Sequence, residues 1–367
     1  MKVDLIVNTI TAWDEAPRAR HQFAAAAAKK FRVAFVTRNK TGLPGIRTYE
    51  GGPNTLVVEP TYPVDYRFRY RLPGVNETYQ TWLYSRLKKM FPEATAVNFD
   101  CTATRLRRYF PTIYYCNDEF AGNSKYKSAL VDRYLARTES IMAGEALFCV
   151  ATSHFLKEKL KKYNTNIYEI PLGVSLDGIT SVGIQPGSSK DKIVVGLMGV
   201  INERQYSPEA VNILLGHDRF KVVIIGPVTR EYLNKLRGVD PSAVKGMLKG
   251  KALYDELAQL DVGLALYNLD FVNPGGTPNK VWQYMAVGKP TVISALPNLK
   301  YMKFPDHTVY VTQGNHDLIE MIEKAYAEST PELVKERIDF AYQNTWDHRF
   351  EQFLEAYQRH TGKGATL

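Results

Sequence analysis

Short apolar runs alternate with longer helical stretches along almost the whole chain, and this alternation most constrains the fold. Parallel strands are buried on both faces and need long crossover connections, so the pattern is typical of a parallel sheet wound with helices. We therefore predict an α/β protein. Strands are expected at residues 3–8, 33–37, 55–58, 96–99, 112–115 and 147–151 in a first series, and at 193–198, 221–225, 262–266, 291–294 and 308–311 in a second.

A break between the two series indicates two domains. Residues 178–192 turn to Gly, Ser, Pro and charged side chains, a composition typical of a linker. The length of 367 residues fits the same division, because domains average about 150 residues. We expect one domain over residues 1–180 and a second over 190–345, followed by a closing segment at 346–367.

The composition argues against several classes of protein. No stretch approaches the about 20 apolar residues that cross a bilayer, and the apolar run within residues 1–10 is too short for a signal peptide. The cysteines Cys101, Cys116 and Cys149 are an odd number without metal-like spacing, which fits a reducing cytosol and argues against zinc. We expect a globular, cytoplasmic protein.

Charge is distributed unevenly along the chain. The net charge is +9, and residues 1–180 hold 26 Lys and Arg against 17 Asp and Glu, whereas the remainder holds 21 of each. The first half is therefore expected to meet an anionic partner. Basic clusters lie at 66–71, 105–108 and 157–162. The first alternates Arg with aromatic residues, which suits a membrane interface, a phosphate-bearing strand or an ordinary solvated surface.

Residues 274–294 carry the most specific signal for function. The turn Gly275-Gly276-Thr277 leaves backbone amides open to the close approach of a polyanion. In the short helix that follows, Lys280 and Gln283 share one face near the positive N-terminus, opposite an apolar face. The segment is expected to hold a phosphate group. The alternative is a capped core helix with a solvated lysine.

This segment resembles that of the two-domain GT-B glycosyltransferases, specifically the "glycosyl transferases group 1" class that builds bacterial surface polysaccharides. Many of those enzymes carry a Pro-x-Lys-x-x-Glu-Tyr-Met/Leu-Ala-x-Gly-Lys-Pro run whose Lys binds the donor diphosphate and whose Glu binds the ribose hydroxyls. Here Lys280 matches the Lys and Gln283 replaces the Glu. An amide lacks the charge-assisted grip of a carboxylate on a diol, so Gln283 is expected to hold the ribose less firmly.

The resemblance implies a fold and further donor contacts. The fold would be two Rossmann-like domains facing each other across a cleft, with residues 346–367 packing back on the first domain. Gly199, in a glycine-rich turn, and Arg204 are expected beneath the diphosphate, although Arg204 can instead pair with a nearby glutamate. Backbone groups of Met247 and Leu248 are expected to contact the nucleobase, which leaves both UDP- and GDP-sugars open as donors.

Catalysis is expected at Asp118. Residues 113–120 resemble the Tyr-Asp-x-x-Asp-Asp/Glu-Phe segment of the polysaccharide enzymes and follow a predicted strand, where open α/β sheets bind ligands. In an inverting transfer a carboxylate takes the proton of the acceptor hydroxyl. Asp118 is the first candidate and Glu119 the second, with His21 and His154 as rival bases. Asp118 can equally cap the following helix, and the sequence leaves inverting and retaining mechanisms open.

The expected donor chemistry uses no metal and no other cofactor. The sequence has no Asp-x-Asp motif, and Lys280, Arg204 and helix-end amides would neutralise the diphosphate. We predict transfer of a sugar, expected to be a hexose, from a nucleoside-diphosphate sugar to a glycan or lipid-linked acceptor, by a cytoplasmic enzyme peripheral to the inner membrane face. The alternatives are a phage-type glycosyltransferase acting on modified DNA bases, a non-catalytic nucleotide-sugar or nucleic-acid binding protein, and a nucleotide-sugar epimerase.

Overall fold

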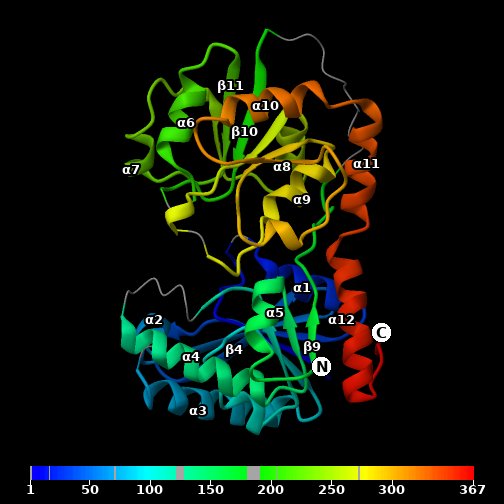
Figure 1. Cartoon of the computed structure of the whole chain (residues 1–367). Coiled ribbons are helices and arrows are strands. Elements are labelled where there is room, and N and C mark those ends of the chain that lie inside the picture. The colour runs from blue at the N-terminus through cyan, green and yellow to red at the C-terminus, as the bar shows by residue number, and fades with distance from the viewer. Residues whose placement is uncertain are drawn as a thin grey trace. The chain divides into compact units, whose positions relative to one another are not determined.

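The chain forms two compact units (Figure 1). Unit 1 comprises Met1–Leu172 and Trp346–Leu367, and unit 2 comprises Gly173–Thr345. Residues 173–179, placed by the sequence in the first domain and the start of the linker, belong to unit 2. Residues 180–190 of that linker lie outside the described residues. The computed structural model describes residues 2–15, 17–69, 72–120, 128–179, 191–203, 205–271 and 273–367.

Unit 1 is built on one sheet. Its strands are β1 (Leu5–Asn8), β2 (Val33–Val36), β3 (Lys40–Thr41), β4 (Gly45–Gly52), β5 (Thr55–Tyr62), β6 (Thr95–Asn98), β7 (Thr112–Cys116), β8 (Cys149–Ala151) and β9 (Ile167–Glu169). The strand order is β3-β5-β2-β1-β6-β7-β8-β9, and β4 pairs with β5. Only the β4–β5 pair is antiparallel among these strands. The predicted strands of the first series are all present, and β3, β4 and β9 are additional.

Helices cover both faces of this sheet (Figure 1). The helices of unit 1 are α1 (Ala19–Ala27), α2 (Tyr66–Arg69), α3 (Val75–Met90), α4 (Ala129–Gly144), α5 (His154–Leu160) and α12 (Trp346–Thr361). Successive side chains of a strand point to opposite faces. Leu5 and Val7 of β1 accordingly join the core beneath α1 and α12, whereas Ile6 joins the core beneath α3. Both faces of the central strands are buried, which explains their nearly unbroken apolar sequence.

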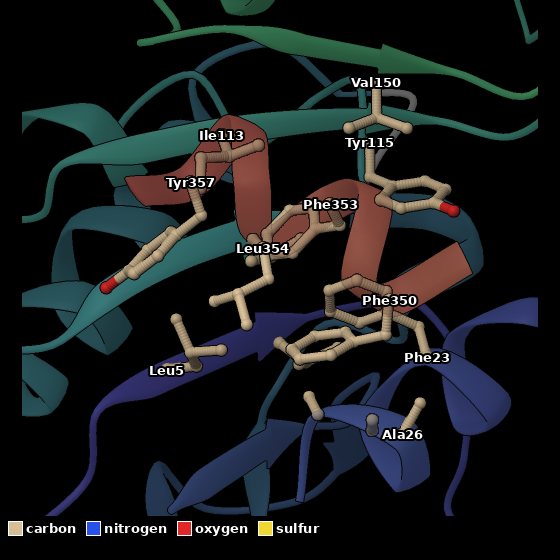
Figure 2. Close-up of a cluster of buried hydrophobic side chains, with 14 of the residues drawn as sticks. Leu5, Phe23, Ala26, Ile113, Tyr115, Val150, Phe350, Phe353, Leu354 and Tyr357 are labelled. Carbon is tan, nitrogen blue, oxygen red and sulfur yellow. The ribbon is translucent and has the colours of Figure 1, made fainter. Parts of the chain in front are cut away.

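The last helix of the chain completes one core of unit 1. Phe350, Phe353 and Tyr357 of α12 are buried in one cluster with Phe23 of α1 and with side chains of β1 and β7 (Figure 2). The rings of Phe23 and Phe353 meet edge to face, with their centroids 4.9 Å apart. Because a fully buried large apolar side chain contributes about 1.5–3 kcal/mol, α12 is an integral part of unit 1.

Unit 2 has the strand order of a dinucleotide-binding sheet. Its strands are β10 (Ile193–Met198), β11 (Phe220–Ile225), β12 (Val244–Gly246), β13 (Val262–Ala265), β14 (Thr291–Ser294) and β15 (Val309–Thr312). Its helices are α6 (Pro208–Leu215), α7 (Arg230–Leu233), α8 (Gly250–Ala258), α9 (Asn279–Ala286), α10 (Leu318–Ala327) and α11 (Pro331–Tyr342). The order is β12-β11-β10-β13-β14-β15, with every pair parallel.

This order fixes where a ligand can bind in each unit. The chain winds outward from β10 to β12, then returns to place β13 on the other side of β10. Unit 1 reverses in the same way at β1, which lies between β2 and β6. In open α/β sheets ligands bind at the carboxyl ends of the strands beside such a reversal. The segments after β10, β13, β1, β6 and β7 are therefore the places where functional side chains are expected.

Candidate functional site

Two glycines shape the carboxyl end of β10. Gly199 follows β10 with a backbone φ of 111°, a value that L side chains rarely adopt. Its amide donates to the carbonyl oxygen of Ile225 at 2.9 Å. Gly226 follows β11, and a Cβ placed on it would lie 2.0 Å from the carbonyl oxygen of Gly199. The turns after β10 and β11 therefore pack backbone against backbone, at the point where the strand order reverses.

Lys280 reaches this turn from α9. Its Nζ donates to the Tyr206 hydroxyl at 2.7 Å and lies 4.2 Å from the ring centroid of Tyr206 and 4.7 Å from that of Tyr267. The Tyr206 hydroxyl in turn donates to the Met198 carbonyl oxygen at 2.7 Å. A Cβ on Gly199 would lie 3.1 Å from Lys280 Cε, so the glycine makes room for the lysine. The ammonium is thus held at the carboxyl end of β10.

The Lys280 ammonium has no counter-charge in this position. Its side chain is half-buried, and no carboxylate of the described residues forms an ion pair with it. Burial lowers the pKa of Lys280 from its ordinary value of 10.5 to about 7. The two tyrosine rings attract the cation, but they do not replace an anion. A bound diphosphate would supply the missing negative charge.

Helix α9 has the two faces that the sequence predicts. Trp282 and Met285 are buried, whereas Lys280 and Gln283 are partly exposed. The Gln283 side chain forms no hydrogen bond with any of the described residues, which leaves its amide available to a ligand. Gly288 ends the helix with a φ of 76°, and the backbone hydrogen bonds of a Schellman motif accompany it. Lys280 and Gln283 therefore lie one turn apart beside the carboxyl edge of the sheet.

The loop before α9 is closed by its own hydrogen bonds. The Gly275 amide donates to Asn273 Oδ1 at 2.8 Å, and the Gly276 amide donates to the Asn273 carbonyl oxygen at 2.9 Å. Asn298 Nδ2 donates to two carbonyl oxygens of the loop, at 2.7 Å and 3.0 Å. The two amides that the sequence suggested for an anion are thus engaged with Asn273. The loop is preformed, and the Lys280 ammonium rather than these amides is placed to meet a phosphate.

The remaining predicted donor contacts lie along the same unit. Arg204 lies outside the described residues. Thr277 is half-buried just before α9. Met247 and Leu248 follow the edge strand β12, where Met247 is exposed and Leu248 packs in part against the core. Their backbone groups lie at the carboxyl end of the sheet, the same end at which the Lys280 ammonium is held. This position is compatible with binding of the nucleobase.

Unit 1 carries the two candidate carboxylates directly after β7. Asp118 is half-buried, and its Oδ1 accepts from the Glu119 amide at 2.9 Å. The next described helix, α4, has Ser128 at its N-cap position, so Asp118 does not cap a described helix. Glu119 is only 5% exposed. Of the two carboxylates, Asp118 is the one that a substrate can reach.

Glu119 belongs to a buried ionic cluster. Lys159 of α5 pairs with Glu119 at 2.9 Å and with Glu139 of α4 at 2.6 Å. Glu139 also accepts from the Tyr114 hydroxyl at 2.9 Å. Burial alone would lower the pKa of Lys159, but the nearby Cys116 and the two carboxylates outweigh burial and raise it. This arrangement joins β7, α4 and α5, and it favours a structural role for Glu119.

We expect Lys159→Met to destabilise unit 1 by about 3–5 kcal/mol, because it leaves two buried carboxylates without their counter-charge. Urea denaturation at pH 7 measures the change. Lys161→Met is the matched control, since Lys161 pairs with Glu158 on the surface and its loss should cost less than about 1 kcal/mol. Equal effects of the two substitutions would contradict the structural role.

His21 is tied to the backbone at both ring nitrogens. Nδ1 accepts from the Arg18 amide at 3.1 Å, and Nε2 lies 2.9 Å from the Ala12 carbonyl oxygen. The ring also stacks on Phe35, with centroids 5.1 Å apart. Burial lowers the pKa of His21, which keeps the imidazole neutral. In this arrangement His21 fixes the start of α1 and has no free nitrogen to take a substrate proton.

Arg20 belongs to the segment Trp13–His21, which resembles the acceptor-side loop of the GT-B class, but the sequence gives it no separate role. It lies in the first turn of α1 and is 6% exposed, yet its guanidinium forms no hydrogen bond or ion pair with any of the described residues. Burial lowers its pKa, and the negative charges of Asp118 and Asp100 partly oppose this effect. The unpaired charge therefore lies in the electrostatic field of the candidate base. A buried side chain of this kind leaves no distinctive sequence pattern.

The basic cluster at 66–71, for which the sequence left a strand and an irregular loop open, begins as a short helix. Its first four residues form α2, so the side chains do not alternate as they would in a strand. Arg69 is 3% exposed, and its guanidinium lies 3.9 Å from the ring centroid of Tyr79. Arg69 is thus not available to a partner. Arg67 and Phe68 are exposed, and residues 70 and 71 lie outside the described residues.

The described residues contain neither a cluster of metal ligands nor a membrane-spanning helix. Among these residues, no group of three or more His, Cys, Asp or Glu side chains is arranged to hold a metal ion. None of the described helices has the length and apolar character needed to cross a membrane. The three cysteines are buried and free.

Comparison with known sequences gives one curated relative. No family model matches the chain. The chain is 24% identical over 267 residues to the "Putative teichuronic acid biosynthesis glycosyltransferase TuaH" of Bacillus subtilis (strain 168), a match that covers 66% of each protein. The chain thus spans slightly less than two thirds of the length of this relative.

Solved structures match along almost the whole chain. Sucrose-phosphate synthase from Thermosynechococcus elongatus has a TM-score of 0.73 at 14% identity, covering 98% of this chain and 99% of that one. The structure "Trehalose-6-phosphate from E. coli bound with UDP-2-fluoro glucose" has a TM-score of 0.71 at 11% identity, covering 96% and 98%. WaaG, "a glycosyltransferase involved in lipopolysaccharide biosynthesis", has a TM-score of 0.67 at 14% identity, covering 98% and 100%.

These likenesses confirm the fold class. Two Rossmann-like units, the second with the order 3-2-1-4-5-6, give the chain the GT-B fold of the glycosyltransferases it resembles. The proteins to which it is similar are glycosyltransferases, as the motif at Lys280 suggests. At these identities the comparisons establish the fold alone. The roles of individual residues are inferred from the geometry described above.

Proposed function

We propose that the chain is a glycosyltransferase that uses a nucleoside-diphosphate sugar as its donor and binds that donor in unit 2. The observation that carries the proposal is the Lys280 ammonium, which is half-buried at the point where the strand order of unit 2 reverses and has no counter-charge among the described residues. A diphosphate would satisfy this cation and would lie beside the first turn of α9, where the positive end of the helix dipole favours anions. Gln283, one turn along, is placed to accept from a ribose hydroxyl.

In the proposed transfer step, Asp118 acts as the base for the acceptor hydroxyl. In an inverting reaction the acceptor oxygen forms a bond to the anomeric carbon while the bond from that carbon to the diphosphate oxygen breaks. Asp118 takes the acceptor proton, and the departing diphosphate keeps the electron pair beside Lys280. On this proposal the positive charge that stabilises the leaving group comes from Lys280 and α9, so we expect activity to persist in EDTA.

The proposed acceptor is a glycan of a bacterial surface polymer, free or carried on a lipid. The support is the name of the relative TuaH, which refers to teichuronic acid biosynthesis, together with the basic character of residues 1–180. On this proposal the enzyme works at the inner face of the cell membrane and binds its anionic surface peripherally. A basic unit also suits DNA, but no geometric feature of unit 1 favours a duplex over a membrane.

Binding of UDP- and GDP-sugars, followed by calorimetry, tests the donor site. We expect saturable binding of one of them, because Lys280 and α9 offer a preformed diphosphate site. Gln283→Glu should preserve or strengthen this binding, since a carboxylate grips a diol through two charge-assisted hydrogen bonds. The matched control is Gln343→Glu, an exposed residue after α11 that should leave affinity unchanged.

Two outcomes would contradict this assignment. Absence of any nucleotide-sugar binding at millimolar concentration would remove the support for a glycosyltransferase. A large loss of affinity in Gln283→Glu alone would show that this side chain faces the phosphates rather than the ribose, because a second negative charge would then repel the donor.

A further inference from the structure

A hollow of 440 Å³ lies within unit 1, between α3, α4 and the 3₁₀ turn Leu106–Arg108. Four arginines line it, Arg105, Arg107 and Arg108 from the turn and Arg137 from α4. The N-terminus of α3 opens onto the same hollow at Gly74. Both the helix end and the side chains present positive charge to one space.

The acidic groups nearby do not neutralise this charge. Glu77 is the acidic residue of the lining, and its Oε2 accepts from the Gly74 amide at 2.5 Å while its Oε1 accepts from the Tyr134 hydroxyl at 3.4 Å. Glu145 pairs with Arg107. Among the described residues, Arg105, Arg108 and Arg137 form no ion pair with any carboxylate. The lining therefore keeps a positive excess.

The arginine-bearing turn is held rigidly. The Arg105 amide donates to Gln80 Oε1 at 3.0 Å, and Gln80 Nε2 donates to the Thr102 carbonyl oxygen at 2.7 Å. Gln80 is 1% exposed, and Leu106 is fully buried beneath the turn. The backbone of the turn is therefore anchored at Arg105 and Leu106, and the three arginines project from one short segment. Their mutual repulsion is built into the folded state.

Arg107 shows this repulsion most directly. Its Nε is shielded from solvent and has no hydrogen-bond partner among the described residues. Burial lowers the pKa of Arg107, and the charges of Arg108 and Arg105 lower it further. A buried hydrogen-bond donor without a partner is unfavourable. An anion in the hollow could accept a hydrogen bond from Arg107 Nε and would also reduce the repulsion among the arginines.

We propose that this hollow binds the phosphate or diphosphate group of a second ligand. The planar fork of arginine matches phosphate oxygens with paired hydrogen bonds, and several forks converge here. The volume is within the range of small-molecule sites, about 300–1,000 Å³, and exceeds that of a phosphate, so the group would arrive attached to a larger body. The donor cluster around Lys280 belongs wholly to unit 2, so this is a separate site.

The phosphate can come from a soluble compound or from a lipid. Leu72 precedes α3 and Leu130 lies in the first turn of α4, and their exposures are 47% and 79%. Apolar side chains beside a basic hollow are typical of proteins that meet the headgroup region of a membrane. Binding of a lipid-linked acceptor at this hollow rests on the proposed function. Binding of a phosphate group there does not.

Titration with inorganic pyrophosphate tests the site, in the wild type and in Lys280→Ala, which weakens the donor site of unit 2. We expect binding to persist in Lys280→Ala and to fall about tenfold in Arg108→Gln and in Arg137→Gln, the effect of losing one hydrogen bond to a charged group. Arg133→Gln is the matched control, because Arg133 is an exposed residue of α4 outside the hollow and should leave affinity unchanged.

Equal losses in Arg133→Gln and Arg137→Gln would show that pyrophosphate senses only the general surface charge, and would overturn the proposal. So would a lack of pyrophosphate binding in Lys280→Ala together with no sedimentation of the protein with vesicles of phosphatidylglycerol and phosphatidylcholine. Vesicle binding that pyrophosphate displaces and Arg137→Gln weakens identifies a lipid phosphate. Pyrophosphate binding without vesicle binding identifies a soluble one. Failure of nucleotide-sugar binding would overturn only the donor site of unit 2, because the pyrophosphate and vesicle measurements do not depend on that site.

Discussion

Replacing Asp118 with asparagine is expected to lower turnover about 100-fold or more while donor affinity stays nearly constant. The substitution keeps the size of the side chain but removes the group that takes the acceptor proton. Asp118 is the accessible carboxylate after β7, since Glu119 is buried against Lys159 and both nitrogens of His21 are engaged. Turnover of the donor with a polysaccharide acceptor, measured beside calorimetry of donor binding, separates the two effects.

Glu119→Gln is the informative companion to this variant. The glutamine cannot form the ion pair with Lys159, so we expect its main effect on stability rather than on turnover. A fully active Asp118→Asn enzyme would remove the base assignment and would favour a retaining mechanism. An Asp118→Asn protein with an unchanged melting temperature and lost turnover would separate a catalytic role from a structural one.

The sequence predicts the sheets well because their signal is local. Every predicted strand is present, since a strand buried on both faces is apolar at nearly every position, as at Ile193–Met198. The hairpin of β4 was not predicted, because Gly45–Gly52 is a glycine-containing, largely solvent-facing strand at the margin of the sheet. Its pairing with β5 depends on register across the turn rather than on an apolar run.

The sequence predicts residues of the candidate site only where they belong to a recognisable motif. Lys280 and Gln283 stand out because capping and periodicity place them on one exposed helical face. The burial of Glu119 could not be foreseen, since its partners Glu139 and Lys159 come from two later helices. The burial of Arg69 could not be foreseen either, because its guanidinium packs on Tyr79 of α3, a contact that leaves no local sequence pattern.

Replacing Lys280 with alanine is expected to weaken UDP or GDP binding by about 1.5–3 kcal/mol, the range for loss of a hydrogen bond to a charged group. The alanine removes the positive side chain and leaves the diphosphate with the dipole of α9 alone. Lys300→Ala provides the control, because Lys300 is an exposed lysine of the same unit that lies over the ring of Tyr301. Calorimetry showing equal affinity in the wild type and Lys280→Ala would end the assignment of Lys280 to the diphosphate.

The pH dependence of donor binding gives a second, independent signature of Lys280. Burial holds the pKa of the free lysine at about 7, and a bound diphosphate should raise it, because negative charge favours the ammonium form. Below pH 7 the lysine is already charged, so affinity for a UDP- or GDP-sugar should be nearly constant. Above pH 7 binding requires uptake of a proton, and affinity should fall by up to about tenfold per pH unit.

Stability of the free protein should respond to pH in the opposite direction. The unfolded chain holds the Lys280 proton up to its ordinary pKa of 10.5, whereas the folded chain releases it near pH 7. The unfolded state therefore binds more protons between these values, and this group makes the free energy of unfolding rise with pH across that window. Lys280→Met should abolish both the proton uptake on donor binding, measured by calorimetry in buffers of different ionisation enthalpy, and this contribution to stability. A wild-type affinity that stays flat from pH 6 to pH 8.5 would show that the ammonium does not titrate in this range or does not meet the diphosphate.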